Sequence, residues 1–246
     1  PYVIVAPSHM VFKQDFKALL NDHIASGADI TLLYHPTVCA NEAYLNCNYL
    51  TLNRQNGVLS IAKNKGDEIQ RNIFMDTYVM KTDLFMELIQ KARALSSMYT
   101  LAQIVNLFCE ELDVRGHAHE GYFAAITDFK SYYDANMSLL DIDSAEELIN
   151  EDWPIYTRTN DSCPTKYLAD ADVKHSVISN GCLIEGTIEN SIIGRGCTIK
   201  KGVVIKNSVV LPDSLIEEGI IIENHVIDKH SVLLHCKELI APADAP

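Results

Sequence analysis

The sequence predicts an α/β domain with a mostly parallel sheet, followed by a left-handed parallel β-helix. Two patterns predict this fold class. Through the first 150 residues, strand-like and helix-like apolar patterns alternate, which is typical of an α/β layer. From residue 172 onward, aliphatic residues recur at nearly fixed intervals, separated by small or turn-forming residues, which is typical of hexapeptide coils. We therefore expect an α/β domain over 1–150, a linker over 151–171 and a β-helix domain over 172–246.

The α/β part begins with residues 2–6, a wholly apolar run that predicts a central parallel strand buried on both faces. A helix is expected over 15–26, because Phe16 and Leu19 lie on its apolar face and Gly27 follows as a stop signal. The remaining elements expected are a strand over 29–34, a hairpin of strands 49–52 and 58–62, a strand over 74–80, helices over 83–95 and 101–112, a strand near 119–126 and a helix over 129–140.

In the β-helix part, the repeat places one inward aliphatic residue on each side of a coil. Three sides close one coil, and stacked coils form a continuous apolar column. About ten such residues, at roughly 2 kcal/mol of burial each, offset the entropy lost in ordering short strands. A β-sandwich would instead alternate every second residue, so we disfavour it. The expected inward residues are Ile178, Ile184, Ile193, Ile199, Ile205, Leu211, Ile216, Ile222, Ile227 and Val232.

Composition and charge exclude several classes of protein. The 246 residues include 33 acidic and 20 basic side chains, giving a net charge of −13 that repels nucleic-acid phosphates and anionic lipid. No apolar run reaches the roughly 20 residues of a membrane span, and no signal peptide is visible. The seven cysteines are scattered without a C-x-x-C pair, which favours a reduced, cytoplasmic protein in which each cysteine is a small buried hydrophobe.

The sequence lacks a glycine-rich phosphate loop, although an α/β nucleotide-binding sheet normally begins with one. Either the domain binds no nucleotide, or its N-terminal portion is absent from this chain. The abrupt start at Pro1, directly before a predicted strand, favours the second interpretation.

Short strings along the chain resemble the ADP-glucose pyrophosphorylase (glucose-1-phosphate adenylyltransferase) family. They occur in the family's order and run nearly from end to end, so the ordered set is specific although no single string is. The string at 8–16 (SHMVFKQDF) resembles the family's G-D-H-V-Y-K-M-D-Y, and those at 27–31 (GADIT), 120–123 (EGYF), 133–137 (YDANM), 152–155 (DWPI) and 208–212 (SVVLP) resemble further family motifs.

This resemblance implies a partial, Rossmann-like nucleotidyltransferase domain ahead of the β-helix. The family joins ATP and glucose 1-phosphate into ADP-glucose and pyrophosphate for glycogen synthesis. Two anionic reactants must meet, so Mg²⁺ held by aspartates, together with lysines on the phosphates, supplies most of the catalysis.

The chain departs from the family at its metal ligands. A gapless alignment places one metal-binding aspartate on His9 and the other on Ala125. Alanine cannot bind a metal, and a neutral imidazole is a poor ligand for the hard Mg²⁺ ion. We therefore expect no metal site, with His9 and Ala125 as degenerate catalytic positions and the loss of roughly three or more decades of rate.

The resemblance also maps the sugar-phosphate pocket. The family's Glu-Lys pair falls on Asn64 and Lys65, so Lys65 and, more weakly, Asn64 are the candidate substrate contacts. Two small pocket residues of the family fall near Tyr49 and Phe74, whose larger side chains would fill the sugar site.

These departures resemble the GlgD-type regulatory subunit of the family, which modulates a catalytic paralogue in a hetero-oligomer. The alternative is a fully active nucleotidyltransferase whose metal site is completed differently, and a β-helix acyltransferase is a remote third. We expect self-association through the β-helix flank and sugar-phosphate effectors, with basic residues Arg158, Lys166 and Lys174 as weak candidate contacts.

Overall fold

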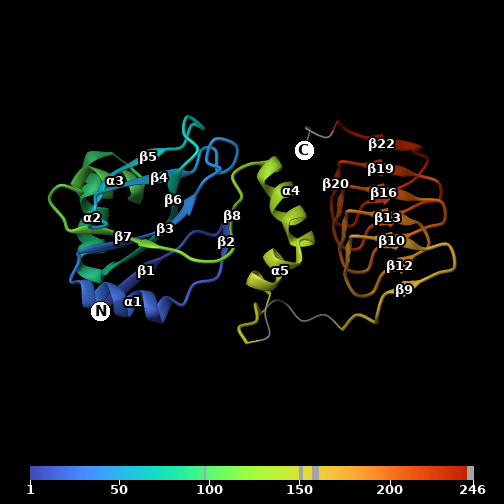
Figure 1. The fold of residues 1–246 in the computed structure, drawn as a ribbon, viewed down its shortest axis with the longest axis horizontal. Coiled ribbons are helices and arrows are strands. Elements are labelled where there is room, and N and C mark those ends of the chain that lie inside the picture. The colour runs from blue at the N-terminus through green and yellow to red at the C-terminus, as the bar shows by residue number, and fades with distance from the viewer. Residues whose placement is uncertain (97, 150–151, 157–160, 243–246) are drawn as a thin grey trace. The chain divides into compact units, whose positions relative to one another are not determined.

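The computed structural model describes residues 1–96, 98–149, 152–156 and 161–242. The chain divides into two compact units, residues 1–127 and 128–246 (Figure 1). We describe each unit by itself. Among the described helices, the longest has 14 residues, and none is long and apolar enough to cross a bilayer.

The first unit is built on a six-stranded mixed sheet in the order β5-β4-β6-β3-β7, with β1 added to β6. A separate two-stranded ladder joins β2 and β8 (Figure 1). The strands are β1 (Tyr2–Val5), β2 (Met10–Phe12), β3 (Ile30–Thr37), β4 (Asn48–Leu52), β5 (Val58–Lys63), β6 (Arg71–Lys81), β7 (Val114–Ala118) and β8 (Phe123–Ala125).

The α/β class is confirmed, but the expectation of a mostly parallel sheet is wrong. Only the β3–β7 pairing is parallel among the pairings described for this sheet, and β6 is antiparallel to β1, β3 and β4. The first strand is likewise not central. It pairs only with β6 in the described part of the chain, and its residues are half-buried or exposed. Its apolar side chains are therefore those of a half-covered edge strand.

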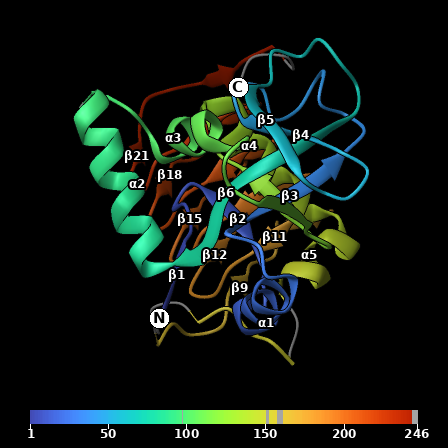
Figure 2. The same ribbon diagram turned by 90° about the vertical axis from the view of Figure 1, so that its left-hand side faces the viewer.

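Helices α1 (Phe16–Ser26), α2 (Thr82–Leu95) and α3 (Leu101–Phe108) complete the first unit. The carboxylate of Asp15 caps the start of α1, and Gly27 ends it with a φ of 68°, as the sequence predicts. Leu88 of α2 and Ile104 of α3 pack with Phe74 of β6 in one core cluster. Figure 2 shows the ribbon of these two helices and of β6.

On the other side of the sheet, a second core cluster joins α1 to β2 and β8. Leu19 of α1 packs there with Ile73 and Met75 of β6 and with Phe123 and Ala125 of β8. The sheet therefore separates the α2–α3 layer from the β2–β8 ladder, and the aligned catalytic positions belong to the second side.

The second unit begins with helices and continues into the coils. Its helical elements are α4 (Phe129–Met137), the 3₁₀ turn η1 (Ser138–Leu140) and α5 (Ile142–Leu148). The expected helix over 129–140 is confirmed as α4 and η1. The Tyr133 hydroxyl of α4 donates to the carbonyl oxygen of Asn207 on the coils at 2.7 Å, which ties the helix to the β-helix.

The β-helix is confirmed as three parallel sheets, with strand orders β9-β12-β15-β18-β21, β10-β13-β16-β19-β22 and β11-β14-β17-β20. Thr198 pairs with Leu215 and Leu215 with Val232, so a full coil takes 17 residues, or sides of six, six and five. One coil is shorter, because Leu183 pairs with Thr198 only 15 residues on. Two- and three-residue strands make up the coils: β9 (Lys166–Tyr167), β10 (Asp172–Lys174), β11 (Val177–Ile178), β12 (Leu183–Ile184), β13 (Thr187–Glu189), β14 (Ile192–Ile193), β15 (Thr198–Ile199), β16 (Val204–Lys206), β17 (Val209–Val210), β18 (Leu215–Ile216), β19 (Ile221–Glu223), β20 (Val226–Ile227), β21 (Val232–Leu233) and β22 (Glu238–Ile240).

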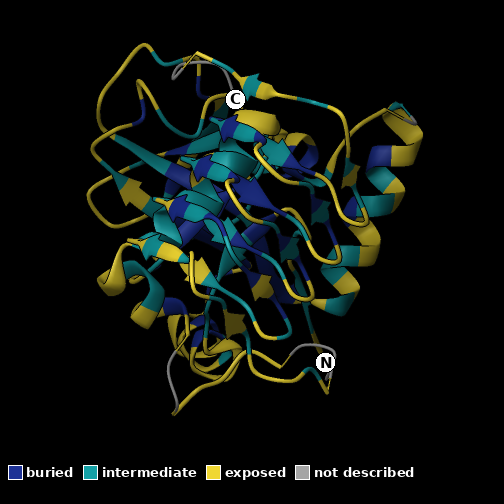
Figure 3. Cartoon of the chain, turned by 90° about the vertical axis from the view of Figure 1, so that its right-hand side faces the viewer, coloured by how far each residue is buried: buried dark blue, intermediate teal, exposed yellow. Residues whose placement is uncertain are grey.

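The interior of the coils is the predicted apolar column, except at two positions. Val232 is exposed and Leu211 lies outside the buried cluster, and their neighbours Leu233 and Val210 belong to the cluster instead. Ile184, Ile193, Ile199, Ile205, Ile216 and Ile222 are completely buried, while many residues at the coil corners are exposed (Figure 3). Cys182 and Cys197 also belong to this column. The expectation that every cysteine is buried is wrong for Cys39 and Cys163, which are exposed.

Candidate functional site

The two positions aligned with the family's metal aspartates lie side by side. Met10 pairs with Ala125 in the β2–β8 ladder, and the backbone N–H of Ile126 donates to the carbonyl oxygen of His9 at 2.9 Å. Residues more than one hundred positions apart in the sequence therefore meet at one end of this ladder. We call the surroundings of His9 and Ala125 the ladder corner.

The donor set at the ladder corner does not fit Mg²⁺. Ala125 offers only a methyl group and is 6% exposed, and His9 offers an imidazole instead of a carboxylate. Across the described residues, no group of three or more histidine, cysteine, aspartate or glutamate side chains is arranged to hold a metal ion. Mg²⁺ prefers several oxygen ligands in octahedral geometry, so the side chains at these two positions cannot supply the family's site.

One acidic residue at the ladder corner was missed by the sequence analysis. Asp76 lies within β6, where the β3–β6 register shifts between Leu33 and Tyr34, and its backbone φ is +43°. Burial raises the pKa of the Asp76 carboxyl, while attraction to His9 and a hydrogen bond with the Asn48 side chain lower it. The signal in the sequence was a single acidic residue inside the apolar string FMDTYVM.

The candidate sugar-phosphate contacts occupy different environments. Asn64 is 1% exposed, and its amide nitrogen donates to the carbonyl oxygens of Ala40 at 2.8 Å and Tyr44 at 3.1 Å. Its amide oxygen accepts from the backbone N–H of Gly66 at 3.1 Å. Asn64 therefore holds the 40–46 loop against the end of β5, whereas Lys65 is exposed to solvent.

The two bulky residues expected to fill the sugar pocket lie on opposite sides of the sheet. Tyr49 packs with the cluster that contains Ala125, and the Arg71 guanidinium lies 4.0 Å from the centre of its ring. Phe74 is completely buried on the α2–α3 side, where its ring meets Tyr78 edge-on. Phe74 and Tyr49 therefore belong to different cores and do not face one common space.

Aromatic side chains pack beside the ladder corner. Tyr44 stacks on Phe123 with ring centres 5.2 Å apart, and its hydroxyl donates to the carbonyl oxygen of Phe123 at 3.0 Å. Burial raises the pKa of Tyr44, so the hydroxyl remains protonated and serves as a structural donor. His35 lies 5.2 Å from Phe123 and 6.1 Å from His119 between ring centres. Burial and the neighbouring His119 lower the pKa of His35.

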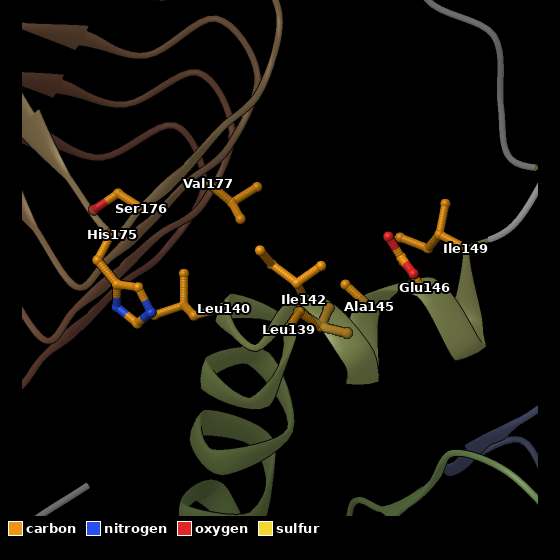
Figure 4. A pocket seen from close by; sticks show the side chains of 9 residues that line it. All are labelled: Leu139, Leu140, Ile142, Ala145, Glu146, Ile149, His175, Ser176 and Val177. Atoms are coloured by element: carbon orange, nitrogen blue, oxygen red, sulfur yellow. The ribbon is translucent and has the colours of Figure 1, made fainter.

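The second unit contains an apolar groove between its helices and the first coil (Figure 4). Its volume is about 550 Å³. Leu140, Ile142 and Ile149 line one side, His175 and Val177 line the other, and the candidate residues His9, Ala125, Asn64 and Lys65 do not contribute to it.

The candidate effector contacts are only partly described. Lys174 forms an ion pair with Asp172 at 2.8 Å, and Lys166 is an exposed residue of β9. Arg158 lies outside the described residues.

Comparisons with known proteins match both parts of the chain. The GlmU-like, C-terminal hexapeptide family matches residues 164–238. The glycogen biosynthesis protein GlgD of Geobacillus stearothermophilus is 30% identical over 204 residues, which cover 83% of this chain and 49% of that protein. The glucose-1-phosphate adenylyltransferase of the same organism is 28% identical over 209 residues, covering 83% of this chain and 53% of that protein. GlgD of Bacillus subtilis (strain 168) is 26% identical over 205 residues, covering 83% and 49%.

These similarities confirm the resemblance to the ADP-glucose pyrophosphorylase family that the ordered strings predict. The chain spans about half the length of the relatives it matches. GlgD proteins and adenylyltransferases match it at similar identity, so overall similarity does not separate a regulatory from a catalytic role. That question depends on the residues at the ladder corner.

Proposed function

We propose that this chain acts in glycogen biosynthesis as a weakly catalytic or non-catalytic subunit of glucose-1-phosphate adenylyltransferase. In this role it associates with a catalytic paralogue and modulates its rate of ADP-glucose synthesis. The relatives named for glycogen biosynthesis and for the adenylyltransferase support the pathway and the reaction. Cytoplasmic location and oligomeric assembly are parts of the same proposal.

The observation that carries the proposal is that His9 and Ala125 are neighbours at the ladder corner, where Met10 pairs with Ala125 and the backbone N–H of Ile126 donates to the carbonyl oxygen of His9. The resemblance places the family's two metal carboxylates at these positions, and a Mg²⁺ ion there would neutralise charge on the reacting phosphates. Without the two carboxylates, the corner loses several kcal/mol of transition-state stabilisation, which is about three or more decades in rate.

The Asn64 contacts support the same conclusion. Asn64 stands where the family has a pocket carboxylate, and its side-chain amide is hydrogen-bonded to the 40–46 loop and to Gly66. We infer that it has a structural role. Lys65 remains the proposed contact for a sugar phosphate, because its exposed ammonium group can still reach an anion.

A mixing experiment tests this function. We expect the purified protein to make ADP-glucose from ATP and glucose 1-phosphate at a background rate, measured as pyrophosphate release with Mg²⁺. Mixed with the catalytic adenylyltransferase of its own organism, it should change that enzyme's rate or effector response. A heat-inactivated sample is the control. Rapid turnover by the protein alone, or no effect on the partner at any ratio, would contradict the proposal.

The alternative is an active nucleotidyltransferase with a rearranged metal site, and one observation favours it. Asp76 brings a carboxylate to the ladder corner that could serve as a replacement ligand. This alternative predicts that ATP and glucose 1-phosphate together protect the protein from proteolysis only when Mg²⁺ is present. The regulatory role predicts no such dependence on Mg²⁺.

A further inference from the structure

A polar pocket lies in the first unit, away from the ladder corner. Four elements line it: the C-terminal half of α1, strands β3 and β7, and the turn between β4 and β5. Its volume is about 260 Å³. The candidate residues His9, Ala125, Asn64 and Lys65 do not contribute to it, so this pocket is separate from the positions aligned with the family's reaction.

The register between β3 and β7 gathers polar side chains on the face that α1 covers. Thr31 pairs with Arg115, and Leu33 pairs with His117. Because successive side chains alternate between the two faces of a sheet, these four side chains share one face. Leu33 packs there in the core cluster that joins α1 to the sheet. Thr31, Arg115 and His117 therefore meet the end of α1 and line the pocket.

Two of the lining side chains are almost completely buried. His23 of α1 is 2% exposed and Thr31 is 5% exposed. Nδ1 of His23 forms a hydrogen bond with the Thr31 hydroxyl at 2.8 Å. The other ring nitrogen, Nε2, forms no hydrogen bond with any residue that the structure describes. The imidazole therefore keeps one nitrogen for a ligand.

The β4–β5 turn is fixed by its own hydrogen bonds. The backbone N–H groups of Gln55 and Gly57 both donate to the side-chain oxygen of Asn53 at 2.8 Å. The backbone N–H of Gly116 donates to the carbonyl oxygen of Asn56 at 2.8 Å, which fastens the turn to β7. Within the described part of the chain, the side-chain amide of Gln55 makes no hydrogen bond. A preformed support therefore presents this amide to the pocket.

The charges around the pocket disfavour an anionic ligand. The Arg115 guanidinium is engaged by the Asp113 carboxylate through two hydrogen bonds, at 3.0 and 2.7 Å. Asp22 adds an exposed carboxylate, and burial lowers the pKa of His23, which is therefore neutral near pH 7. Among the described lining residues, a phosphate would meet the Asp22 carboxylate and no unpaired arginine or lysine.

We propose that this pocket binds one unit of a neutral sugar through His23, Gln55 and His117. A sugar hydroxyl both donates and accepts, as do an imidazole and a carboxamide, and the Asp22 carboxylate can accept from two adjacent hydroxyls. The volume lies just below the usual range for drug-sized ligands, which suits a single sugar ring, either free or at the end of a glucan. The inference goes beyond the proposed function and does not depend on it.

Titrations followed by saturation-transfer difference NMR test the ligand class. We expect D-glucose and maltotriose to bind saturably. Glucose 1-phosphate, for which the proposed contact is Lys65, should not displace them. Both neutral sugars support the proposal and differ in what they identify: tighter binding of maltotriose indicates the end of a glucan, and equal binding indicates a free monosaccharide.

Two substitutions locate the binding. Gln55→Ala and His117→Ala should each weaken sugar binding by about three- to tenfold, because each removes a hydrogen-bonding partner. Gln55 is exposed, so Q55A should fold as the wild type does. Gln90→Ala, at an exposed position of α2 outside the pocket, is the matched control and should leave the affinity unchanged.

Hydrogen–deuterium exchange locates the site without any substitution. Saturating maltotriose should slow exchange of the backbone amides of residues 53–57 and 115–117, and leave residues 123–127 unchanged.

Three results would overturn the proposal: no saturable binding of either neutral sugar, binding that both Q55A and H117A leave unchanged, or displacement of the sugar by glucose 1-phosphate. None of them bears on the mixing experiment, so failure of this inference and failure of the proposed function can be told apart.

Discussion

The backbone N–H of Ile126 donates to the carbonyl oxygen of His9 at 2.9 Å, next to the pairing of Met10 with Ala125. This short ladder fixes the two aligned catalytic positions relative to each other regardless of which side chains occupy them. In our proposal, this backbone arrangement corresponds to the family's metal site, and the two carboxylates are absent from it. Such a site can be tested by restoring the ligands.

Restoring both carboxylates should create metal-dependent stability. In the variant His9→Asp/Ala125→Asp, the aspartate at position 125 is placed at a site where the native residue is 6% exposed. An unpaired buried carboxylate costs about 3–5 kcal/mol of unfolding free energy. Binding of Mg²⁺ to the folded state should restore part of the lost unfolding free energy. The gain is about 2.7 kcal/mol when the free Mg²⁺ concentration is one hundred times the dissociation constant. The melting temperature with and without 10 mM Mg²⁺ measures the effect.

Ala124→Asp is the matched control for this restoration. Ala124 is 9% exposed and pairs with Val11 in the same ladder, yet it is not an aligned ligand position. We expect a similar loss of stability and no recovery with Mg²⁺. Equal recovery in both variants would show that the ladder corner is not a latent metal site.

Stability should fall on the acidic side of neutrality because of His23. This residue is 2% exposed, and its Nδ1 lies 2.8 Å from the Thr31 hydroxyl. Burial, followed by repulsion from Lys81, lowers the pKa of His23 from its ordinary 6.5, with Asp29 opposing. The unfolded chain therefore takes up the proton first as the pH falls.

The resulting pH window follows from the sign of this shift. The stability that neutral His23 provides is complete above about pH 6.5 and is lost as the pH falls through the lowered pKa of the folded state. Urea unfolding between pH 8 and pH 5 should show this loss, and His23→Gln should make the profile flatter. His35, whose pKa is also lowered by burial, should leave a residual slope in that variant. An identical slope in both proteins would contradict the assignment to His23.

The β-helix could be predicted because its period fixes which residues point inward. One aliphatic residue on each side of a coil is a local rule, and Ile199, Ile205 and Ile216 obey it with complete burial. The sheet of the first unit follows no such local rule. An apolar run such as residues 2–5 is compatible with a central strand and with an edge strand. The pairing with β6, which only the structure shows, identifies β1 as antiparallel.

The sequence predicted only those features of the candidate site that depend on local residue strings. His9 and Ala125 were found by aligning short strings, and their proximity is a tertiary fact that the β2–β8 ladder provides. Asp76 was missed because a bulge depends on the register between β3 and β6, which no local pattern encodes. The role of Asn64 depends on a loop 20–24 residues earlier in the chain, so its residue type alone could not show it.

Thiol reactivity should distinguish the exposed cysteines from those buried in the interior of the coils. Cys39 and Cys163 are exposed, whereas Cys182 and Cys197 lie in the coil interior at 3% and 0% exposure. Reaction with an aromatic disulfide reagent under native conditions should label the exposed pair within minutes and leave the coil pair unmodified until urea is added. Peptide mass spectrometry identifies the sites. Rapid native labelling of Cys197 would show that the coils open readily.

A ladder of side-chain amides along one corner of the coils should contribute strongly to stability. The Asn190 amide donates to Asn207 at 2.7 Å, and the Asn207 amide donates to Asn224 at 3.2 Å. All three residues have positive φ, and that of Asn207 is 44°. Asn207→Ala removes two hydrogen bonds and places a β-carbon in the left-handed region, so we expect a loss of about 2–4 kcal/mol.

Asn207→Gly separates the two causes. Glycine adopts positive φ without strain, so this variant loses the hydrogen bonds and should be about 1 kcal/mol more stable than Asn207→Ala. Asn180→Ala, at an exposed coil position outside the ladder, should change the unfolding free energy by no more than about 0.5 kcal/mol. Equilibrium urea unfolding gives all three values. An Asn207→Gly variant as stable as the wild type would show that conformation alone selects asparagine here and that the amide ladder contributes nothing.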